Sequence, residues 1–186
     1  MSAETVISAG LAGRIRHSLG LGRGVVEIVP YDPRWPVIFH ELVAELLPHL
    51  PAAVVAVEHV GSTAVPGLPA KAILDVVIGA RHDADAPLVT AALERFGFLP
   101  RAESGEPELH RNFGLELDER VRLVNAHLVR YGGSHWSAYL SFRDRLRADD
   151  AARDRYARLK DDLAARFGDD RQGYVDGKTA FVHSLS

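Results

Sequence analysis

A short stretch in the first half of the chain has the composition of a phosphate-binding turn. Gly61, Ser62 and Thr63 follow an apolar run, and a loop rich in proline and glycine connects them to a second apolar run that contains Asp75. A Gly-Ser turn exposes backbone N–H groups and a hydroxyl, which suit phosphate oxygens. Asp75 is the candidate catalytic acid and would hold a divalent cation over such a phosphate. The pattern predicts a phosphate site, and an ion pair with Lys71 is the alternative role for Asp75.

Further polar groups are expected near the same strand ends. Glu58 ends the preceding apolar run and would supply a second carboxylate. In the run over residues 121–129, alternation places Asn125 and His127 on one face of a strand and Arg122 on the other. Neutral imidazole binds Mn²⁺ or Zn²⁺ and serves as a general base near pH 7. Glu58 and His127 are therefore candidate catalytic and metal-binding residues, with Asn125 in support. An ion pair with an arginine is the alternative for Glu58.

Cationic side chains are the second requirement of a phosphate site. The candidates for direct phosphate contact are Lys71, Arg143 and Lys178, and the supporting candidates are His59, Arg111 and Lys160. Each cation also has a plainer interpretation, because lysine and arginine at the edge of an apolar stripe usually extend into solvent. For His59 the plainer interpretation is a hydrogen bond to the turn that follows it. Six other histidines are interpreted as surface or packing residues: His17, His40, His49, His82, His135 and His183.

The composition limits the class of protein. The chain has 186 residues, of which 47% are hydrophobic and 25% are charged, as in an ordinary globular domain. A net charge of -3 and the lack of a basic tract argue against nucleic acid as a partner. The chain has no cysteine, so disulfides and thiolate chemistry are excluded. No apolar run reaches the roughly 18 residues that span a membrane, and no signal peptide is expected. These features predict a cytoplasmic protein and leave its oligomeric state open.

Hydrophobic periodicity predicts an α+β (mixed α/β) domain over residues 25–186. Helices are predicted over 36–47 and 88–96, and strands over 53–57, 72–78, 113–117 and 121–129. Three more helices are predicted after the last strand: one is capped by Ser134, one runs over 150–167, and one contains Tyr174 and Val182. Residues 1–24 are expected to form an arm or a short docking helix. Residues 25–30 are expected to form a strand or an extended lead-in.

Taken together, these motifs resemble the GrpB family. The residues that carry the resemblance are the segment 31–35 (Tyr-Asp-Pro-Arg-Trp), the segment 58–71, the triplet 125–127 (Asn-Ala-His), Trp136 and the triplet 142–144 (Phe-Arg-Asp). The resemblance extends from Val25 to the C-terminus. It implies the fold of the nucleotidyltransferase superfamily, in which a palm made of a short mixed sheet and flanking helices is followed by a helical C-terminal tail.

The same resemblance implies a chemistry from which the sequence departs. In active nucleotidyltransferases the Gly-Ser turn holds a triphosphate. Two acids one residue apart on the next strand, and a third on a later strand, hold two Mg²⁺ ions. The first acid matches Asp75, whereas Val77 stands at the second position and Asn125 and His127 at the third. The implied cofactor is Mg²⁺ or Mn²⁺ on Asp75, joined by Glu58 or His127, and the implied substrate is a nucleotide.

Two functions therefore remain open. The first is a nucleotidyltransferase-fold protein that binds a nucleotide or another phosphorylated small molecule together with a divalent ion and transfers a nucleotidyl group to a small acceptor. The second is a catalytically inert binding or accessory module that retains the pocket of the palm fold. Convergence of several titratable groups favours the first function. Val77, in place of an acid, favours the second.

Overall fold

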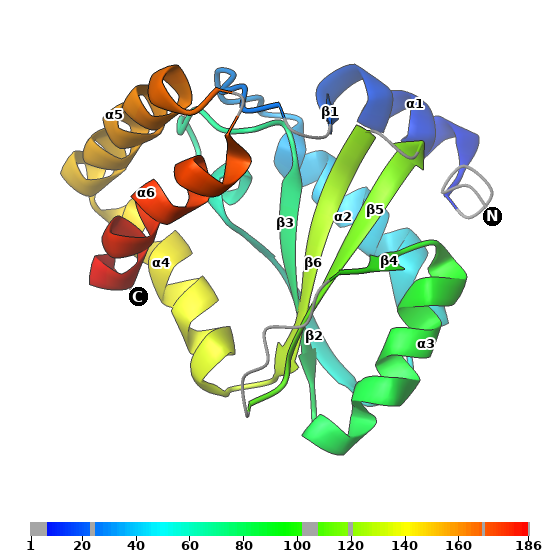
Figure 1. Ribbon diagram of the computed structural model, residues 1–186. Helices are drawn as coiled ribbons and strands as arrows, with labels where there is room; N and C mark the ends of the chain where they lie inside the picture. Colours follow the sequence, from blue (N-terminus) through cyan, green and yellow to red (C-terminus); the bar gives the residue numbers. More distant parts are fainter. Residues whose placement is uncertain (1–6, 23–24, 102–107, 119–120, 169, 186) are drawn as a thin grey trace.

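The structure is a computed structural model that describes residues 7–22, 25–101, 108–118, 121–168 and 170–185. Within these residues one mixed sheet has the strand order β2-β3-β6-β5-β4, with β1 also paired to β6 (Figure 1). The strands are β1 (Leu21–Gly22), β2 (Val54–Val60), β3 (Leu74–Ala80), β4 (Leu99–Pro100), β5 (His110–Asp118) and β6 (Val121–Arg130). Only β3 and β6 form a parallel pair among the described strands, and the other pairs are antiparallel. The predicted mixed α/β class is confirmed.

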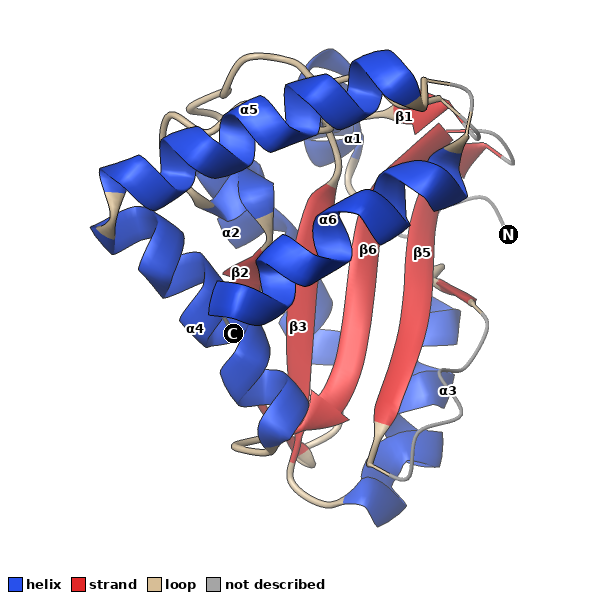
Figure 2. Cartoon of the chain, turned by 60° about the vertical axis from the view of Figure 1, so that its left-hand side comes forward, coloured by secondary structure: helices blue, strands red, loops and turns tan. Residues whose placement is uncertain are grey.

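Helices cover both faces of the sheet. They are α1 (Ala9–Ser18), α2 (Trp35–Leu46), α3 (Ala86–Phe96), α4 (Ser134–Ala148), α5 (Asp150–Arg166) and α6 (Arg171–Leu185), and a 3₁₀ turn, η3, spans Ser62–Ala64. Helices α1, α2 and α3 lie on one face, and α4, α5 and α6 lie on the other (Figures 1 and 2). Figure 2 shows α6 crossing in front of β3, β6 and β5. In the described part of the chain, no helix is both long and apolar enough to cross a bilayer.

The side chains of β3 alternate between the core face of the sheet and the opposite face, which carries Asp75. Leu74, Val76 and Ile78 are buried in the main hydrophobic core, beneath α1, α2 and α3. Because successive side chains of a strand point to opposite faces, Asp75 and Val77 face α4, α5 and α6 instead. Val77 packs there in a smaller apolar cluster. β3 is otherwise apolar on both faces, so Asp75 is its single acidic side chain and faces α4, α5 and α6.

The N-terminal segment is part of the fold. Leu11 and Ile15 of α1 are fully buried in the main core, and β1 pairs with the start of β6. The structure thus shows the docking helix rather than a separate arm over residues 7–22, while residues 1–6 and 23–24 lie outside the described residues. The next segment is the extended lead-in and contributes one isolated bridge, Val29 to Ala70.

Helices α5 and α6 begin at aspartates whose side chains accept hydrogen bonds from the first turn of the helix. Asp149 precedes α5 and accepts a hydrogen bond from the backbone N–H of Ala152 (2.9 Å). Asp170 accepts one from the N–H of Gly173 (3.0 Å) at the start of α6. Such bonds satisfy donors that a helix leaves open in its first turn. Ser134 is the first residue of α4 rather than its cap, which is a glycine.

Candidate functional site

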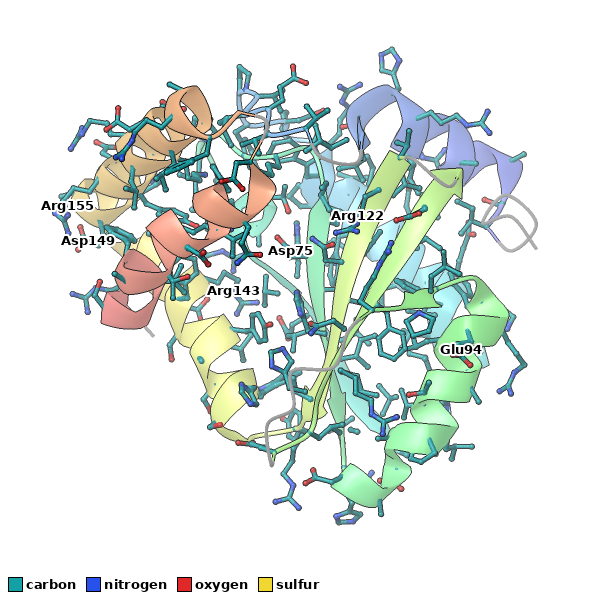
Figure 3. The ribbon with its side chains drawn as sticks, in the orientation of Figure 1. Asp75, Glu94, Arg122, Arg143, Asp149 and Arg155 are labelled. Carbon is teal, nitrogen blue, oxygen red and sulfur yellow. The ribbon has the colours of Figure 1, made fainter. Side chains whose placement is uncertain are left out.

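A cleft opens on the sheet face that carries α4, α5 and α6. It has two connected lobes, of about 130 Å³ and about 670 Å³. Five residues line both lobes: Ser62, Asp75, Arg122, Asn125 and Lys178. Figure 3 shows Asp75 and Arg122 toward the middle of the molecule, whereas Glu94, Asp149 and Arg155 lie near its edges. The cleft therefore lies between the centre of the sheet and the C-terminal helices.

Asp75 stands where the two lobes meet. Its Oδ1 accepts a hydrogen bond from Asn125 Nδ2 (2.9 Å) and lies 4.0 Å from His127 Nε2. Burial opposes the charged form, but the contacts with His127 and Asn125 and the charge of Lys178 outweigh burial. The pKa of Asp75 is therefore below its usual value. The structure thus brings these three predicted residues together around an ionised carboxylate.

Gly61 allows the backbone to turn beside Asp75. Its φ of 68° and ψ of -168° define a region that glycine alone occupies readily. A Cβ atom at this position would lie 2.8 Å from the Cβ of Asp75. The following 3₁₀ turn brings Ser62 and Thr63 to the cleft wall. The turn therefore needs glycine both for its backbone angles and for its close approach to the acid.

Two arginines of α4 hold this turn in place. Arg147 donates to the Ala64 carbonyl from Nε (3.0 Å) and from Nη2 (2.8 Å). Arg143 Nη1 donates to the carbonyl of His59 (3.0 Å), just before the turn. Hydrogen bonds from a charged donor are stronger than those between neutral groups. The helix thereby fixes the position of a segment about 80 residues earlier in the chain.

Arg143 and Glu58 pair with each other outside the cleft. The Nη1 of Arg143 lies 2.8 Å from a carboxylate oxygen of Glu58, and its Nε lies 2.7 Å from Asp144. Glu58 pairs across the sheet with Val77 rather than with Asp75. It therefore lies opposite a position two residues beyond Asp75 along β3. Neither Glu58 nor Arg143 lines either lobe. The interpretation of Glu58 as an ion-pair partner of an arginine therefore describes the structure.

His59 and Arg111 also lie away from the cleft. The Nε2 of His59 is hydrogen-bonded to Thr63 Oγ1 (2.9 Å), and its ring stacks on Phe39 (4.8 Å between centroids). Burial lowers the pKa of His59 to about 4, so this imidazole is neutral. Arg111 donates to Thr90 Oγ1 (3.4 Å) of α3, on the opposite face of the sheet. Neither His59 nor Arg111 lines either lobe.

The smaller lobe contains every lysine of the chain. Of its 22 lysine and arginine residues only three are lysines, Lys71, Lys160 and Lys178, and all three line this lobe, which we call the lysine lobe. The ring of Tyr174 lies beneath two of them, 3.9 Å from Lys71 Nζ and 5.4 Å from Lys178 Nζ. An aromatic face attracts ammonium groups. Three cations thus surround one small space together with Ser62 and Thr63.

Lys160 is the most deeply buried of the three lysines. It is 2% exposed, donates to the Pro69 carbonyl and lies 4.9 Å from the centroid of the Tyr156 ring. It forms no salt bridge with any residue of the described segments. Burial, reinforced by the charge of Lys178, lowers the pKa of Lys160 to about 7. The charge of Asp161 offsets this burial only in part, so Lys160 is a buried amine that no carboxylate of the described segments contacts.

This burial predicts a specific pH dependence of stability. The pKa of Lys160 is about 7 in the folded protein and 10.5 in an exposed lysine. Between these values the unfolded chain binds more protons, so the free energy of unfolding rises with pH, and the burial penalty is complete below about pH 7. We expect Lys160→Met to reduce the rise measured by urea denaturation between pH 7 and pH 9. An equal rise in both proteins would contradict the shifted pKa.

Aromatic rings line the larger lobe. Asn112 Oδ1 lies 2.7 Å from His127 Nδ1 and accepts its hydrogen bond, which holds the imidazole with Nε2 on the side of Asp75. The ring of Tyr139 lies 4.7 Å from that of His127. His110 and His135 line the same lobe, with ring centroids 4.4 Å apart. This lobe can therefore accept the organic part of a ligand and exchange protons with it.

A β-bulge turns Arg122 toward the cleft. Leu115 pairs with Val124 and Glu116 pairs with Arg122, so one residue of β6 between them has no opposite partner. Bulges of this kind change the direction of a side chain. Arg122 Nη1 now lies 3.4 Å from Asn125 Oδ1, and both residues line the two lobes. The prediction that Arg122 and Asn125 face opposite sides is therefore wrong.

Some cleft residues escaped the sequence analysis although signals for them existed. The first strand of the hairpin begins at His110 rather than at residue 113, and alternation from there places His110 and Asn112 on the face of His127. His135 lines the larger lobe and is not simply a surface residue. The scarcity of lysine, in a chain rich in arginine, was the signal for the lysine lobe. A second signal was the position of Tyr174, four residues before Lys178 on a predicted helix, because residues four apart lie on the same helix face.

The donor atoms at Asp75 do not fit the implied pair of Mg²⁺ ions. Among the described residues, no group of three histidines, aspartates or glutamates is arranged to hold a metal ion. Val77 replaces the second acid on β3, and Glu58 is held by α4. Mg²⁺ requires several hard oxygen ligands in octahedral geometry. The metal-binding roles predicted for Glu58 and His127 therefore find no support in this arrangement.

Comparison with known proteins identifies the family. Residues 25–186 match the family described as GrpB protein. The UPF0157 protein BH1888 of Halalkalibacterium halodurans is 36% identical over 161 residues, covering 86% of this chain and 80% of that protein. The crystal structure of the conserved protein GrpB from Enterococcus faecalis has a TM-score of 0.75 and 28% identity, covering 86% of this chain and 94% of that one. Cid1 in complex with the UTP analogue UMPNPP is a weaker match, with a TM-score of 0.43, 12% identity, and coverage of 90% and 51%. The chain belongs to the GrpB family.

Proposed function

We propose that the cleft binds a phosphorylated small molecule, such as a nucleotide, with a phosphate group in the lysine lobe. The observation that carries the proposal is the convergence of Lys71, Lys160 and Lys178, the only lysines of the chain, on one small space. Ammonium groups and hydroxyls are common phosphate ligands, and a buried cation is costly unless an anion compensates it. Bound phosphate would supply a direct anionic partner for Lys160, which forms no salt bridge with the described residues.

The larger lobe would hold the rest of the molecule. Its walls combine the rings of Tyr139, His110 and His135 with the polar groups of Asn112 and His127. Small-molecule pockets commonly have apolar and aromatic walls with a few polar groups that fix orientation. The lobe volume of about 670 Å³ lies within the usual range for such pockets. A phosphate ester with a planar or apolar organic group fits both lobes together.

A transfer reaction is the second candidate function. The observation that favours it is the position of His127, whose Nε2 lies 4.0 Å from Asp75 and whose Nδ1 is held by Asn112. This imidazole would accept the proton of an acceptor hydroxyl while the hydroxyl oxygen bonds to phosphorus. Pyrophosphate would leave with the electron pair of the broken P–O bond. Catalytically inert binding remains the alternative to this reaction.

Binding can be tested with the full chain and defined phosphate compounds. We expect inorganic phosphate, ATP, CTP, GTP or CoA to raise the melting temperature, because a ligand that binds only the folded state stabilises it. Lys71→Gln and Lys178→Gln should each weaken binding about tenfold in calorimetry, through loss of a charge-assisted contact. Arg14→Gln, which removes an exposed charge paired with Glu41, is the matched control and should not change binding. If none of these probes shifts the melting temperature at millimolar concentration, the proposal is wrong.

A further inference from the structure

Lys160 is buried more completely than the other two lysines of the lysine lobe. It is 2% exposed, whereas Lys71 and Lys178 are half-buried. It extends from α5 one helical turn after Tyr156, and its Nζ atom lies 4.9 Å from the centroid of the Tyr156 ring. The same Nζ atom contacts Pro69 in the loop before β3. These two contacts fix the position of an amine at the wall of a space of about 130 Å³.

One hydrogen bond orients this amine. Nζ of Lys160 donates to the carbonyl oxygen of Pro69, which can only accept. A neutral amine has two N–H groups and one lone pair, so the group directed at Pro69 is an N–H and not the lone pair. The loop carbonyl thus holds the nitrogen through a hydrogen atom. The lone pair is left for a group that enters the lobe.

The surroundings of Lys160 favour the neutral amine, which is the nucleophilic form. Burial lowers the pKa of Lys160 to about 7, and the charge of Lys178 adds to this effect, while Asp161 opposes it. About half of such an amine is neutral at pH 7, compared with roughly 0.03% of an exposed lysine. Removal from water, beside a second cation, is a known way in which enzymes activate a lysine as a nucleophile.

We infer that Lys160 is a nucleophile that forms a Schiff base with a small aldehyde or ketone bound in the lysine lobe. The Nζ lone pair bonds to the carbonyl carbon, and the π electrons of the C=O bond move to oxygen. The two protons of the amine pass to that oxygen, which leaves as water while the C=N bond forms. One amine and one carbonyl compound thus give one imine and one water, with no oxidant or reductant. This chemistry goes beyond the proposed phosphate binding and does not depend on it.

The shape of the cleft limits the carbonyl compound. The lysine lobe, of about 130 Å³, has room for only a short group next to Nζ. Ser62 and Asp75 line both lobes, so the rest of a longer molecule can extend into the larger lobe of about 670 Å³. A carbonyl at the end of a short chain fits this arrangement better than one within a bulky ring.

The experiment treats the full chain with glyceraldehyde and sodium cyanoborohydride at pH 7.5. The hydride reduces an imine to a stable secondary amine, and mass spectrometry of peptides then locates the modified lysines. We expect Lys160 to be modified at least tenfold faster than Lys71 and Lys178, because a much larger fraction of it is neutral. Lys160→Arg keeps a cation of similar length but cannot form an imine, and should lose this adduct. Arg158→Met removes an exposed cation from the same helix and is the control that should keep it.

The outcomes separate this inference from the proposed function. Lack of an adduct at Lys160 in the unmodified chain, or equal rates at the three lysines, would overturn the inference. Both results come from the unmodified chain, so they hold even if Lys160→Arg does not fold. Glyceraldehyde 3-phosphate, used in parallel, tests the phosphate site. Fast modification of Lys160 at the same rate by both aldehydes would support the nucleophile and count against phosphate binding. Binding of ATP or inorganic phosphate, without any adduct at Lys160, would support the proposed function and overturn the nucleophile.

Discussion

Asp75→Asn is expected to strengthen anion binding about tenfold, rather than abolish it. Asp75 is ionised and lines both lobes, beside the space in which we propose a phosphate. A unit charge several ångströms away in a medium of effective dielectric near 20 contributes about 1–3 kcal/mol, and tenfold corresponds to about 1.4 kcal/mol. Asparagine keeps the shape and the contact with Asn125 while removing the repulsion. Calorimetric titration with tripolyphosphate in EDTA measures the change.

The sign of this effect separates two mechanisms. If Asp75 instead held a divalent ion, the same substitution would remove the ion and weaken binding, and Mg²⁺ would strengthen binding to the unmodified chain only. Asp154→Asn removes the same charge from an exposed position on α5 and should leave affinity unchanged. A loss of affinity in Asp75→Asn, with normal folding by circular dichroism, would therefore contradict the expected repulsion between Asp75 and the bound anion.

Gly61→Ala is expected to destabilise the protein by about 3–5 kcal/mol. The backbone angles at this position cost a non-glycine residue about 1–3 kcal/mol, and the new Cβ would press against Asp75, which adds a similar amount. For a chain of this size the melting temperature should fall by roughly 10 °C. Because the turn and the acid are packed together, the variant should also lose anion affinity. Thermal and urea unfolding, followed by titration of the folded variant, test both effects.

Gly67 provides the matched control for this substitution. Its φ of 76° is also in the left-handed region, but a Cβ there would meet no atom within 4 Å. Gly67→Ala therefore pays the cost of the backbone angle alone, about 1 kcal/mol. If the two variants were equally stable, the close contact between Gly61 and Asp75 would have no energetic role.

Local patterns in the sequence predicted the elements well. The helix over 36–47 and the strand over 72–78 correspond to α2 and β3 within two residues. Both have clear periodicity and a boundary marked by proline or glycine, which act through local backbone geometry. The grouping of Asn125 with His127 also followed from alternation in one strand. These features depend on neighbouring residues only, so a single sequence contains the information.

Contacts between residues far apart in the sequence could not be predicted from local patterns. Arg143 is an arginine on an amphipathic helix in sequence, and only the packing of α4 against β2 shows that Glu58 is its partner. Arg122 was misplaced because a bulge depends on how two strands align, which periodicity in one strand cannot reveal. The lysine lobe combines a loop, α5 and α6, three segments up to about 100 residues apart. Its chemistry exists only in the folded chain.

The confinement of lysine to one cleft makes the ε-amino groups a reporter of that cleft. Apart from the α-amino group, reagents that acylate primary amines have no other target in this chain. The extent of modification, read by mass spectrometry, would then follow occupancy of the cleft without any engineered label. The same property warns against routine handling steps: amine-directed fluorophores, surface coupling and lysine cross-linkers would all modify the site whose binding they are used to measure.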